Sequence, residues 1–292
     1  MAPLASQALI LDAIFHDDMI IAVGDRGHIL RSRDQGQSWE QSPVPVSIPL
    51  TAINKAAQDR LIVAGHDAVI MVSDDQGASW AIVHREPDWE QPILDLFFIT
   101  PDRGLALGAY GLVLETTDGG ASWAERTLFD GDSHLYASTR LPSGDLLIAG
   151  EFGTLLRSQD DGETWDELDS PYGGTFFGIA TPTVSQPDEP LLVFGLQGNV
   201  FASNDNGDSW TPIATDIPNG LYDAVRTDDG RAVLLGHGGM ILVDRDPSPG
   251  FDWASIIRPA RKPLAGALPL EDGRFLIYGE TGVEILRVEA TP

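Results

Sequence analysis

Thr116-Thr-Asp-Gly-Gly-Ala-Ser-Trp123 is one of five copies of an eight-residue motif, Ser/Thr-x-Asp-x-Gly-x-Ser/Thr-Trp, which we call the box motif. The other copies occupy residues 32–39, 73–80, 158–165 and 203–210, and a degenerate sixth copy runs from residue 244 to 253. Their tryptophans recur every 41 to 45 residues. A fixed period of this length is typical of repeat proteins, in which each repeat is one supersecondary unit.

A Gly-x-x-Gly turn recurs in step with the box motif. The seven turns are residues 24–27, 65–68, 108–111, 150–153, 195–198, 236–239 and 279–282, and the second keeps only its first glycine, as Gly65-His-Asp-Ala68. A short apolar run precedes each turn, such as Leu146-Leu-Ile-Ala149. Strands that are apolar without alternation are covered on both faces. The runs therefore indicate middle strands of sheets that pack between neighbouring sheets.

The first repeat shows how one unit is built. Strands are expected at residues 11–15, 19–23 and 28–31, and a fourth begins at residue 40. Four strands in about 42 residues match a propeller blade. The sequence therefore predicts an all-β, seven-bladed β-propeller, formed as a single domain over residues 1–292. The expected blades are approximately residues 9–48, 49–91, 92–132, 133–172, 173–217, 218–262, and 263–292 with 3–8.

The last blade needs a strand from elsewhere in the chain. The seventh repeat ends near residues 283–288, where its box motif should begin, and so lacks a fourth strand. Residues 3–8 have no other evident place. We expect this N-terminal segment to supply the missing strand, because closure removes an open sheet edge.

The box motif itself is expected to be structural. Short Asp and Ser side chains accept hydrogen bonds from backbone N–H groups of a turn, glycine permits a positive φ, and Trp packs on the sheet. The structural residues are Asp34, Trp39, Asp75, Trp80, Asp118, Trp123, Asp160, Trp165, Asp205 and Trp210. A calcium loop is the alternative at Asp205, but the glutamate that an EF-hand carries at its twelfth position is missing.

Composition excludes several classes of function. The formal net charge is −26, which argues against binding to nucleic acids or to anionic membrane surfaces. The chain has no cysteine, and its six histidines form no metal-binding pair, so neither a metal nor another cofactor is expected. Apolar runs reach only about six residues, too short to insert into a membrane. We expect a monomer.

These motifs resemble the Asp-box, or bacterial neuraminidase, repeat. More specifically, the chain resembles the photosystem II assembly and stability factor family over about residues 10 to 285. The segments that carry this resemblance are Gly108-Ala-Tyr-Gly111, His134-Leu-Tyr136, Gly150-Glu-Phe-Gly153 and Ser170-Pro-Tyr-Gly-Gly-Thr-Phe-Phe-Gly178. They are similar to the non-photosynthetic bacterial branch of the family in particular.

The resemblance implies a non-enzymatic scaffold that helps to assemble a membrane protein complex. It implies a periplasmic or otherwise exported protein, which binds the complex or its extracytoplasmic loops; the bacterial branch is associated with transporters of the resistance-nodulation-division type. No signal peptide is visible at the N-terminus, so the sequence also leaves a cytoplasmic location open. The photosystem factors present a patch of arginines, whereas this chain is acidic.

The partner is expected to bind where the Gly-x-x-Gly turns and the connections between blades share one face. Aromatic residues in connections favour recognition. The candidate partner-binding residues are Arg26, Tyr110, His134, Tyr136, Phe152, Tyr172, Phe176, Phe177, Gln197 and His237. The alternative is that these side chains fill the propeller channel or pack on the adjacent blade.

A sialidase-like glycoside hydrolase is the alternative function. That chemistry needs an arginine cluster, a Tyr–Glu nucleophile pair and a separate acid. Arg31, Arg157, Tyr110 and Glu115 could contribute. Sialidases, however, have six blades and an Arg-Ile-Pro segment that is missing from this chain. The sequence therefore predicts no catalytic residues.

Overall fold

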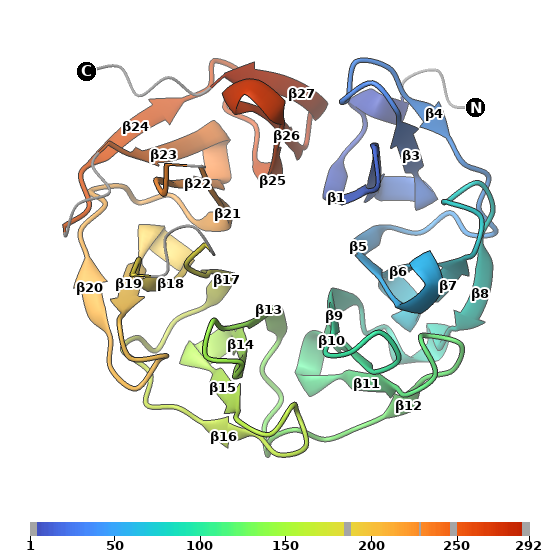
Figure 1. Ribbon diagram of the computed structural model, residues 1–292, viewed down its shortest axis with the longest axis horizontal. Helices are drawn as coiled ribbons and strands as arrows, with labels where there is room; N and C mark the ends of the chain where they lie inside the picture. Colours follow the sequence, from blue (N-terminus) through green and yellow to red (C-terminus); the bar gives the residue numbers. More distant parts are fainter. Residues whose placement is uncertain (1–4, 184–187, 228, 246–249, 288–292) are drawn as a thin grey trace. The chain divides into compact units, whose positions relative to one another are not determined.

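The computed structural model describes residues 5–183, 188–227, 229–245 and 250–287. Its strands form seven antiparallel sheets, each with its strands in chain order (Figure 1). The fold is a seven-bladed β-propeller, as predicted. The chain divides into two compact units, which are described separately below. Unit 1 comprises Met1–Leu135 and Tyr278–Glu284, and unit 2 comprises Tyr136–Ile277 and Ile285–Pro292.

Six of the sheets have four strands and the seventh has three among the described residues. The first three sheets are β1 (Ile10–His16), β2 (Met19–Gly24), β3 (Ile29–Ser32) and β4 (Glu40–Gln41); β5 (Leu50–Lys55), β6 (Leu61–Gly65), β7 (Ile70–Ser73) and β8 (Ala81–His84); and β9 (Ile93–Phe98), β10 (Gly104–Gly108), β11 (Val113–Thr116) and β12 (Ala124–Glu125). The next three are β13 (Leu135–Arg140), β14 (Leu146–Gly150), β15 (Leu155–Ser158) and β16 (Asp166–Glu167); β17 (Phe176–Ala180), β18 (Leu191–Gly195), β19 (Val200–Ser203) and β20 (Thr211–Ile213); and β21 (Leu221–Arg226), β22 (Ala232–Gly236), β23 (Met240–Asp244) and β24 (Trp253–Ile257). The last comprises β25 (Leu264–Pro269), β26 (Arg274–Gly279) and β27 (Gly282–Arg287).

Helical structure in the described residues is limited to three-residue 3-10 turns. They are η1 (Ala5–Gln7), η2 (Asp25–Gly27), η3 (Ala57–Asp59), η4 (His66–Ala68), η5 (Pro87–Trp89), η6 (Ala109–Gly111), η7 (Glu151–Gly153), η8 (Leu196–Gly198), η9 (His237–Gly239) and η10 (Glu271–Gly273). Six of them, η2, η4, η6, η7, η8 and η9, are the Gly-x-x-Gly turns of the first six repeats.

The N-terminal segment differs from the predicted closing strand. Residues 3 and 4 lie outside the described residues, and Ala5–Gln7 form the turn η1 instead of a strand. The segment still packs on β27, because a Cβ added at Gly282 would lie 2.0 Å from the carbonyl oxygen of Ser6. Short residues such as Ala and Ser have little preference for a pleated strand, which is consistent with a turn at this position.

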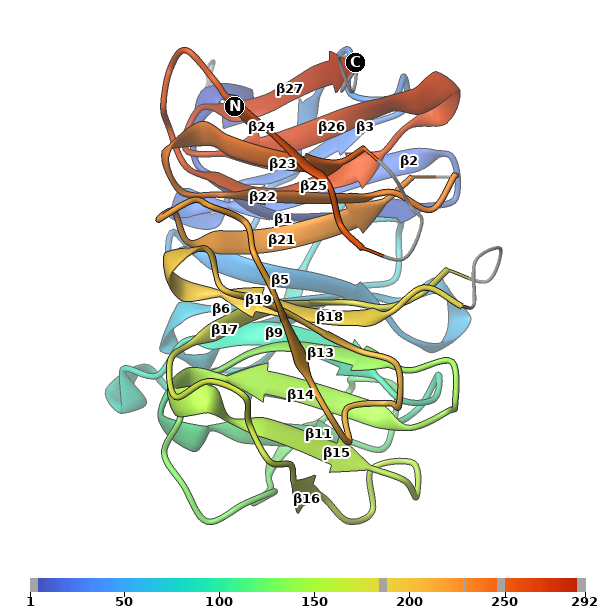
Figure 2. The same ribbon diagram turned by 90° about the vertical axis from the view of Figure 1, so that its left-hand side faces the viewer.

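The apolar runs form buried second strands, as predicted. Every residue of β2, β6, β10, β14, β18 and β22 is buried. In unit 1, one core cluster joins Ile21 of β2 to Val63 of β6. In unit 2, another joins Phe194 of β18 to Leu234 of β22. Figure 2 shows the sheets of unit 2 following one another in chain order. Each core therefore lies between successive sheets.

Polar side chains on the first strands also link successive sheets. In unit 1, Asp12 of β1 accepts a hydrogen bond of 2.8 Å from the backbone N–H of Ile53 in β5. In unit 2, Asp223 of β21 accepts one of 3.0 Å from the N–H of Ala267 in β25. Burial raises the pKa of Asp223 to about 6, although the backbone N–H groups of Ala267 and Ala224 oppose the shift. These aspartates tie neighbouring blades together at their first strands.

The box motif forms a closed turn whose hydrogen bonds repeat from blade to blade. In the second copy, Asp75 Oδ1 accepts from the hydroxyl of Ser73 at 2.8 Å and from the N–H of Ser79 at 2.9 Å. Its Oδ2 accepts from the Ser79 hydroxyl at 2.6 Å. The hydroxyl of Ser79 is the main cause that lowers the pKa of Asp75 to about 2. The aspartate therefore satisfies the turn that precedes each fourth strand.

The tryptophans of the box motif differ in burial. Trp80 is 8% exposed and packs in the core between the first two sheets, while its indole N–H donates to the carbonyl of Gly77 at 3.1 Å. Trp39 makes the same bond to Gly36 at 3.1 Å but is only partly buried. In the degenerate copy, Trp253 stacks on Phe251. Residues 246–249 of that copy lie outside the described residues.

Candidate partner-binding surface

Packing explains the first glycine in five of the Gly-x-x-Gly turns, at residues 24, 65, 108, 195 and 236. A Cβ at Gly24 would lie 2.1 Å from the carbonyl oxygen of Leu9, and one at Gly195 would lie 2.1 Å from that of Thr175. In five of the turns, the residue after this glycine donates its backbone N–H to that same carbonyl, as Asp25 does to Leu9 at 2.9 Å. A side chain would break this contact between the turn and the start of the first strand.

The second glycine of the turn adopts a left-handed backbone conformation, which an alanine adopts in the second repeat. Gly27, Gly111 and Gly153 have φ values of 73°, 70° and 78°. Ala68 adopts a φ of 47° at the same position of the second repeat. A left-handed conformation is unfavourable for alanine but accessible in a turn that the surrounding structure holds.

The turns lie against the connections that lead to the next sheet. In unit 1, Gly111 donates its N–H to the carbonyl of Ser133 at 3.1 Å. In unit 2, Gly153 donates its N–H to the carbonyl of Gly174 at 2.7 Å. Within each unit, we call these turns, the connections that they contact and the first two residues of the strands that follow the connections the turn surface.

Two aromatic residues of the turn surface combine exposure with a left-handed backbone. Tyr110 has a φ of 56° and is 60% exposed, and Phe152 has a φ of 54° and is 73% exposed. A positive φ is unusual for bulky residues and costs about 1 kcal/mol or more. Neither burial nor backbone preference explains these aromatic side chains.

In unit 1, the rings of Tyr110 and His134, two of the predicted site residues, contact each other. Their rings lie 4.6 Å apart, centroid to centroid, in an edge-to-face arrangement. Tyr110 lies in the turn η6 and His134 in the connection before β13. Arg26, another predicted residue of unit 1, is exposed in η2 and pairs with Asp25 at 3.5 Å.

Unit 2 contains a row of three aromatic rings from successive sheets. The ring centroids of Tyr136 and Phe177 lie 5.1 Å apart, and those of Phe177 and Tyr222 lie 5.4 Å apart; both pairs are arranged edge to face. Each of these residues is the second residue of the first strand of its sheet, namely β13, β17 or β21. In Figure 1, each of these three strands lies at the same edge of its own sheet. The hydroxyl of Tyr222 lies 3.4 Å from Nδ1 of the exposed His237. We call Tyr136, Phe177 and Tyr222 the aromatic row.

The hydroxyl groups of the row stay protonated at neutral pH. Burial, aided by the negative charge of Glu151, raises the pKa of Tyr136 to about 12. Burial also raises the pKa of Tyr222. The row therefore presents aromatic faces together with neutral hydroxyl groups, which suits a ligand with both apolar and polar parts.

The structure corrects one predicted residue and adds another. Phe176 is fully buried and packs edge to face on Phe201, so it belongs to the core and not to the surface. Tyr172 is half-buried in the same cluster and stacks on Phe201. The physical reason is that adjacent strand residues point to opposite faces, so Phe177 faces the row and Phe176 does not. Tyr222 was missed, although it repeats the position of Tyr136 and Phe177.

Gln197 completes the predicted set. It occupies the left-handed position of η8, with a φ of 59°, and is exposed. Among the described residues, no group of three or more His, Asp or Glu side chains is arranged to hold a metal ion.

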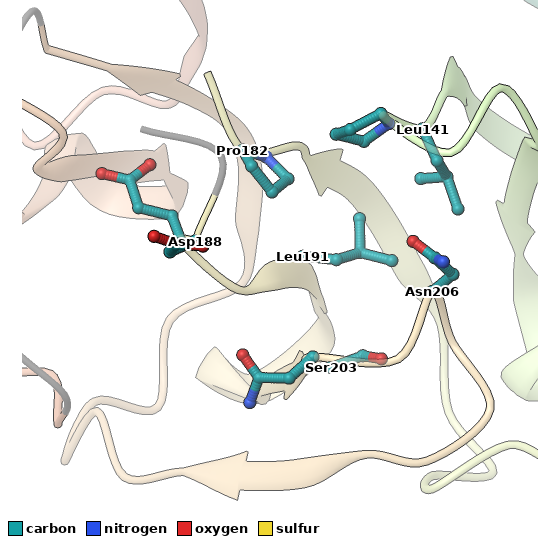
Figure 3. A pocket seen from close by; sticks show the side chains of 9 residues that line it. Leu141, Pro182, Asp188, Leu191, Ser203 and Asn206 are labelled. Atoms are coloured by element: carbon teal, nitrogen blue, oxygen red, sulfur yellow. The ribbon is translucent and has the colours of Figure 1, made fainter. Parts of the chain in front are cut away.

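A separate hollow of about 250 Å³ lies in unit 2, near the turns that follow β13 and β17 (Figure 3). Leu141, Leu191 and Asn206 line it, together with Glu189. Glu189 forms a buried ion pair of 3.1 Å with Arg226, and burial, partly offset by that arginine, raises its pKa. This carboxylate is therefore held as the counter-ion of a buried arginine, which is a structural role.

Comparisons with known proteins agree with the sequence motifs. The family model for "Photosynthesis system II assembly factor YCF48" matches residues 86–181. The photosystem II assembly lipoprotein Ycf48 of Synechococcus sp. (strain CC9902) is 35% identical over 77 residues, which are 26% of this chain and 23% of that protein. A solved structure described as YCF48 bound to D1 peptide has a TM-score of 0.75 and 18% identity, over 97% of this chain and 92% of that one. The chain is a photosystem II assembly factor-like β-propeller.

The match of this β-propeller to Ycf48 thus spans about a quarter of the curated relative, whereas the likeness of fold extends over nearly the whole chain. An ancestral enzyme of the GH74 class also shares the fold, with a TM-score of 0.76 and 13% identity over 97% of this chain and 45% of that one. At such identity, likeness shows the fold alone. No helix among the described residues is long and apolar enough to cross a membrane.

The candidate glycosidase residues are engaged in structural contacts. In unit 1, Glu115 pairs with Arg103 at 2.8 Å and with Arg126 at 2.7 Å. Tyr110 lies in the turn before β11, whereas Glu115 lies near the far end of that strand. Because a strand rises about 3.3 Å per residue, these two side chains do not form a Tyr–Glu nucleophile pair. The geometry does not favour sialidase chemistry.

Proposed function

We propose that this protein is a non-enzymatic docking module that binds an extracytoplasmic segment of a membrane protein complex through its turn surface. The aromatic row of unit 2 is the observation that carries the proposal. Tyr136, Phe177 and Tyr222 come from three successive blades and form one continuous contact surface. Aromatic side chains on a preformed surface supply much of the affinity of protein interfaces.

The comparisons support a binding role and suggest where the protein acts. The similar solved structure is described as bound to a D1 peptide, so a related fold is compatible with peptide binding. The curated relative is described as an assembly lipoprotein, which favours an extracytoplasmic location. These relatives are photosystem factors, so the proposal names a membrane protein complex and leaves the transporter expected from the resemblance as a prediction.

The proposal is tested by capturing the partner from native membranes with wild-type protein and two variants. Tyr222→Ala removes one end of the aromatic row. Phe15→Ala is the matched control, since Phe15 is 44% exposed and lies beside the β1–β2 turn, away from the turn η2 of its own sheet. An interface anchor costs about 2 kcal/mol or more when truncated, which is roughly a thirty-fold loss of affinity.

We expect Tyr222→Ala to lose capture while its melting temperature stays within a few degrees of the wild type, and Phe15→Ala to retain capture. If both variants capture equally well, or if the loss of capture only follows a loss of folding, the turn surface of unit 2 is not the docking site.

A further inference from the structure

The charges around the aromatic row differ between its two ends. At one end, Glu151 begins the turn η7 directly after β14, and β14 is the neighbour of β13 in the sheet, whose second residue is Tyr136. The negative charge of Glu151 also contributes to the raised pKa of Tyr136. At the other end, the turn η9 carries His237 and packs against a basic connection. The backbone N–H of Arg258 donates to the carbonyl of Gly239 at 2.9 Å.

That basic connection also contains Arg261 and Lys262, both of which are exposed. A Cβ added at Gly239 would lie 3.1 Å from Cβ of Arg258 and 3.4 Å from the Cα of Arg261. Three cationic residues therefore lie within a stretch of five residues, although the net charge of the chain is −26. This stretch lies beside the Tyr222 end of the aromatic row. A cationic group of a partner is disfavoured there by like charge.

The geometry points to a docked segment that carries an arginine or lysine, with its cationic group placed against Tyr136 beside Glu151. This inference rests on the proposed function and names the chemistry of its partner. An aromatic ring attracts a cation through its face, and a nearby carboxylate adds a second attraction. The basic connection at the opposite end fixes the direction in which the segment lies, with its uncharged or acidic part near His237.

Charge complementarity favours this occupant over a uniformly acidic one. The acidic chain attracts cationic segments at long range, and the local carboxylate selects the end of the row where the cation binds. The aromatic row then contacts the apolar neighbours of the cation. Each of these effects is worth several-fold in affinity, so together they predict a preference of about tenfold for a cation over its neutral isostere.

The test uses three fluorescently labelled nonapeptides that differ only at one central residue, flanked by phenylalanine and small polar residues. The central residue is arginine, its neutral isostere citrulline, or glutamate. Affinities are measured by fluorescence anisotropy for the unsubstituted protein and three variants, of which Phe177→Ala interrupts the aromatic row. Glu151→Gln removes the proposed carboxylate, and Glu167→Gln is the control, since Glu167 is exposed on the fourth strand β16. Melting temperatures verify that each variant is folded.

We expect the arginine peptide to bind about tenfold more tightly than the citrulline peptide, and the glutamate peptide more weakly than both. Glu151→Gln should reduce the preference to within about twofold, while Glu167→Gln leaves it unchanged. Raising the salt concentration should reduce the preference as well. Phe177→Ala should lower the affinity of the protein for all three peptides.

The inference is overturned if citrulline or glutamate binds as well as arginine, if Glu151→Gln keeps the full preference, or if no peptide binds up to about 1 mM. Its failure is distinguishable from that of the proposed function. Should capture from native membranes still depend on Tyr222, the docking surface stands and only the cationic partner is wrong. Should capture be independent of Tyr222, both are wrong.

Discussion

Replacing Trp80 with alanine should destabilise the protein by about 3 to 5 kcal/mol, the usual cost of removing a large buried aromatic side chain. Trp80 is 8% exposed and is the most deeply buried tryptophan of the box motifs. It packs in the core between the first two sheets, where Ile21 and Met71 also lie. The substitution leaves a cavity there and removes the bond of 3.1 Å to the carbonyl of Gly77.

Two further variants separate burial from hydrogen bonding. Trp80→Phe keeps most of the volume and loses the indole N–H, so it should cost only about 1 to 2 kcal/mol. Trp39→Ala removes an indole with the same bond to its own glycine but with less burial, so it should cost less than Trp80→Ala. These differences in the free energy of unfolding are measured by urea unfolding, monitored by far-ultraviolet circular dichroism. The dependence of that free energy on urea concentration should be the same in all variants. A cost below about 1 kcal/mol for Trp80→Ala would refute a structural role for this tryptophan.

Three other outcomes follow from the structure. The Ser122 hydroxyl, the main cause, lowers the pKa of Asp118 to about 2, so its contribution to stability should persist above pH 4 and be lost as the pH falls toward 2; Asp118→Asn should flatten the acid limb of a plot of melting temperature against pH. Burial raises the pKa of Asp223 to about 6, so ionisation should reduce stability as the pH rises from about 4 to 6, and Asp223→Asn should remove that decline; an unchanged slope in this window would contradict the assignment. Gly195→Ala should lower the melting temperature, because its Cβ would lie 2.1 Å from the carbonyl of Thr175, whereas Gly144→Ala, where a Cβ meets nothing within 4 Å but φ is 98°, would incur only the backbone cost.

The repeated motifs predicted the blades well because each motif has a local physical cause. The box motif closes its turn through hydrogen bonds within eight residues, as Asp75 and Ser79 show. The apolar runs predicted the second strands of the sheets, because a strand covered on both faces needs apolar side chains at every position, as in β6. These features depend on short stretches of sequence and can be predicted without tertiary information.

The residues of the candidate site were harder to predict, because their placement depends on strand register. Phe176 and Phe177 are equally aromatic in the sequence, but opposite faces of one strand place the first in the core and the second in the aromatic row. Aligning the first strands would have placed Tyr222 with Tyr136 and Phe177, because a buried residue precedes each of the three. The closing strand was wrong at Ala5–Gln7, where no local motif specified the pairing.

Site-specific photo-crosslinking tests the docking surface most directly. A benzophenone amino acid in place of Phe152, which is 73% exposed on the turn surface, should cross-link a membrane protein in native membranes. The same amino acid in place of Phe15, which is 44% exposed beside the β1–β2 turn, should not. Cross-linking to one partner from position 152 and none from position 15 is the predicted result. The same partner captured from position 15, with nothing captured from position 152, would contradict the account.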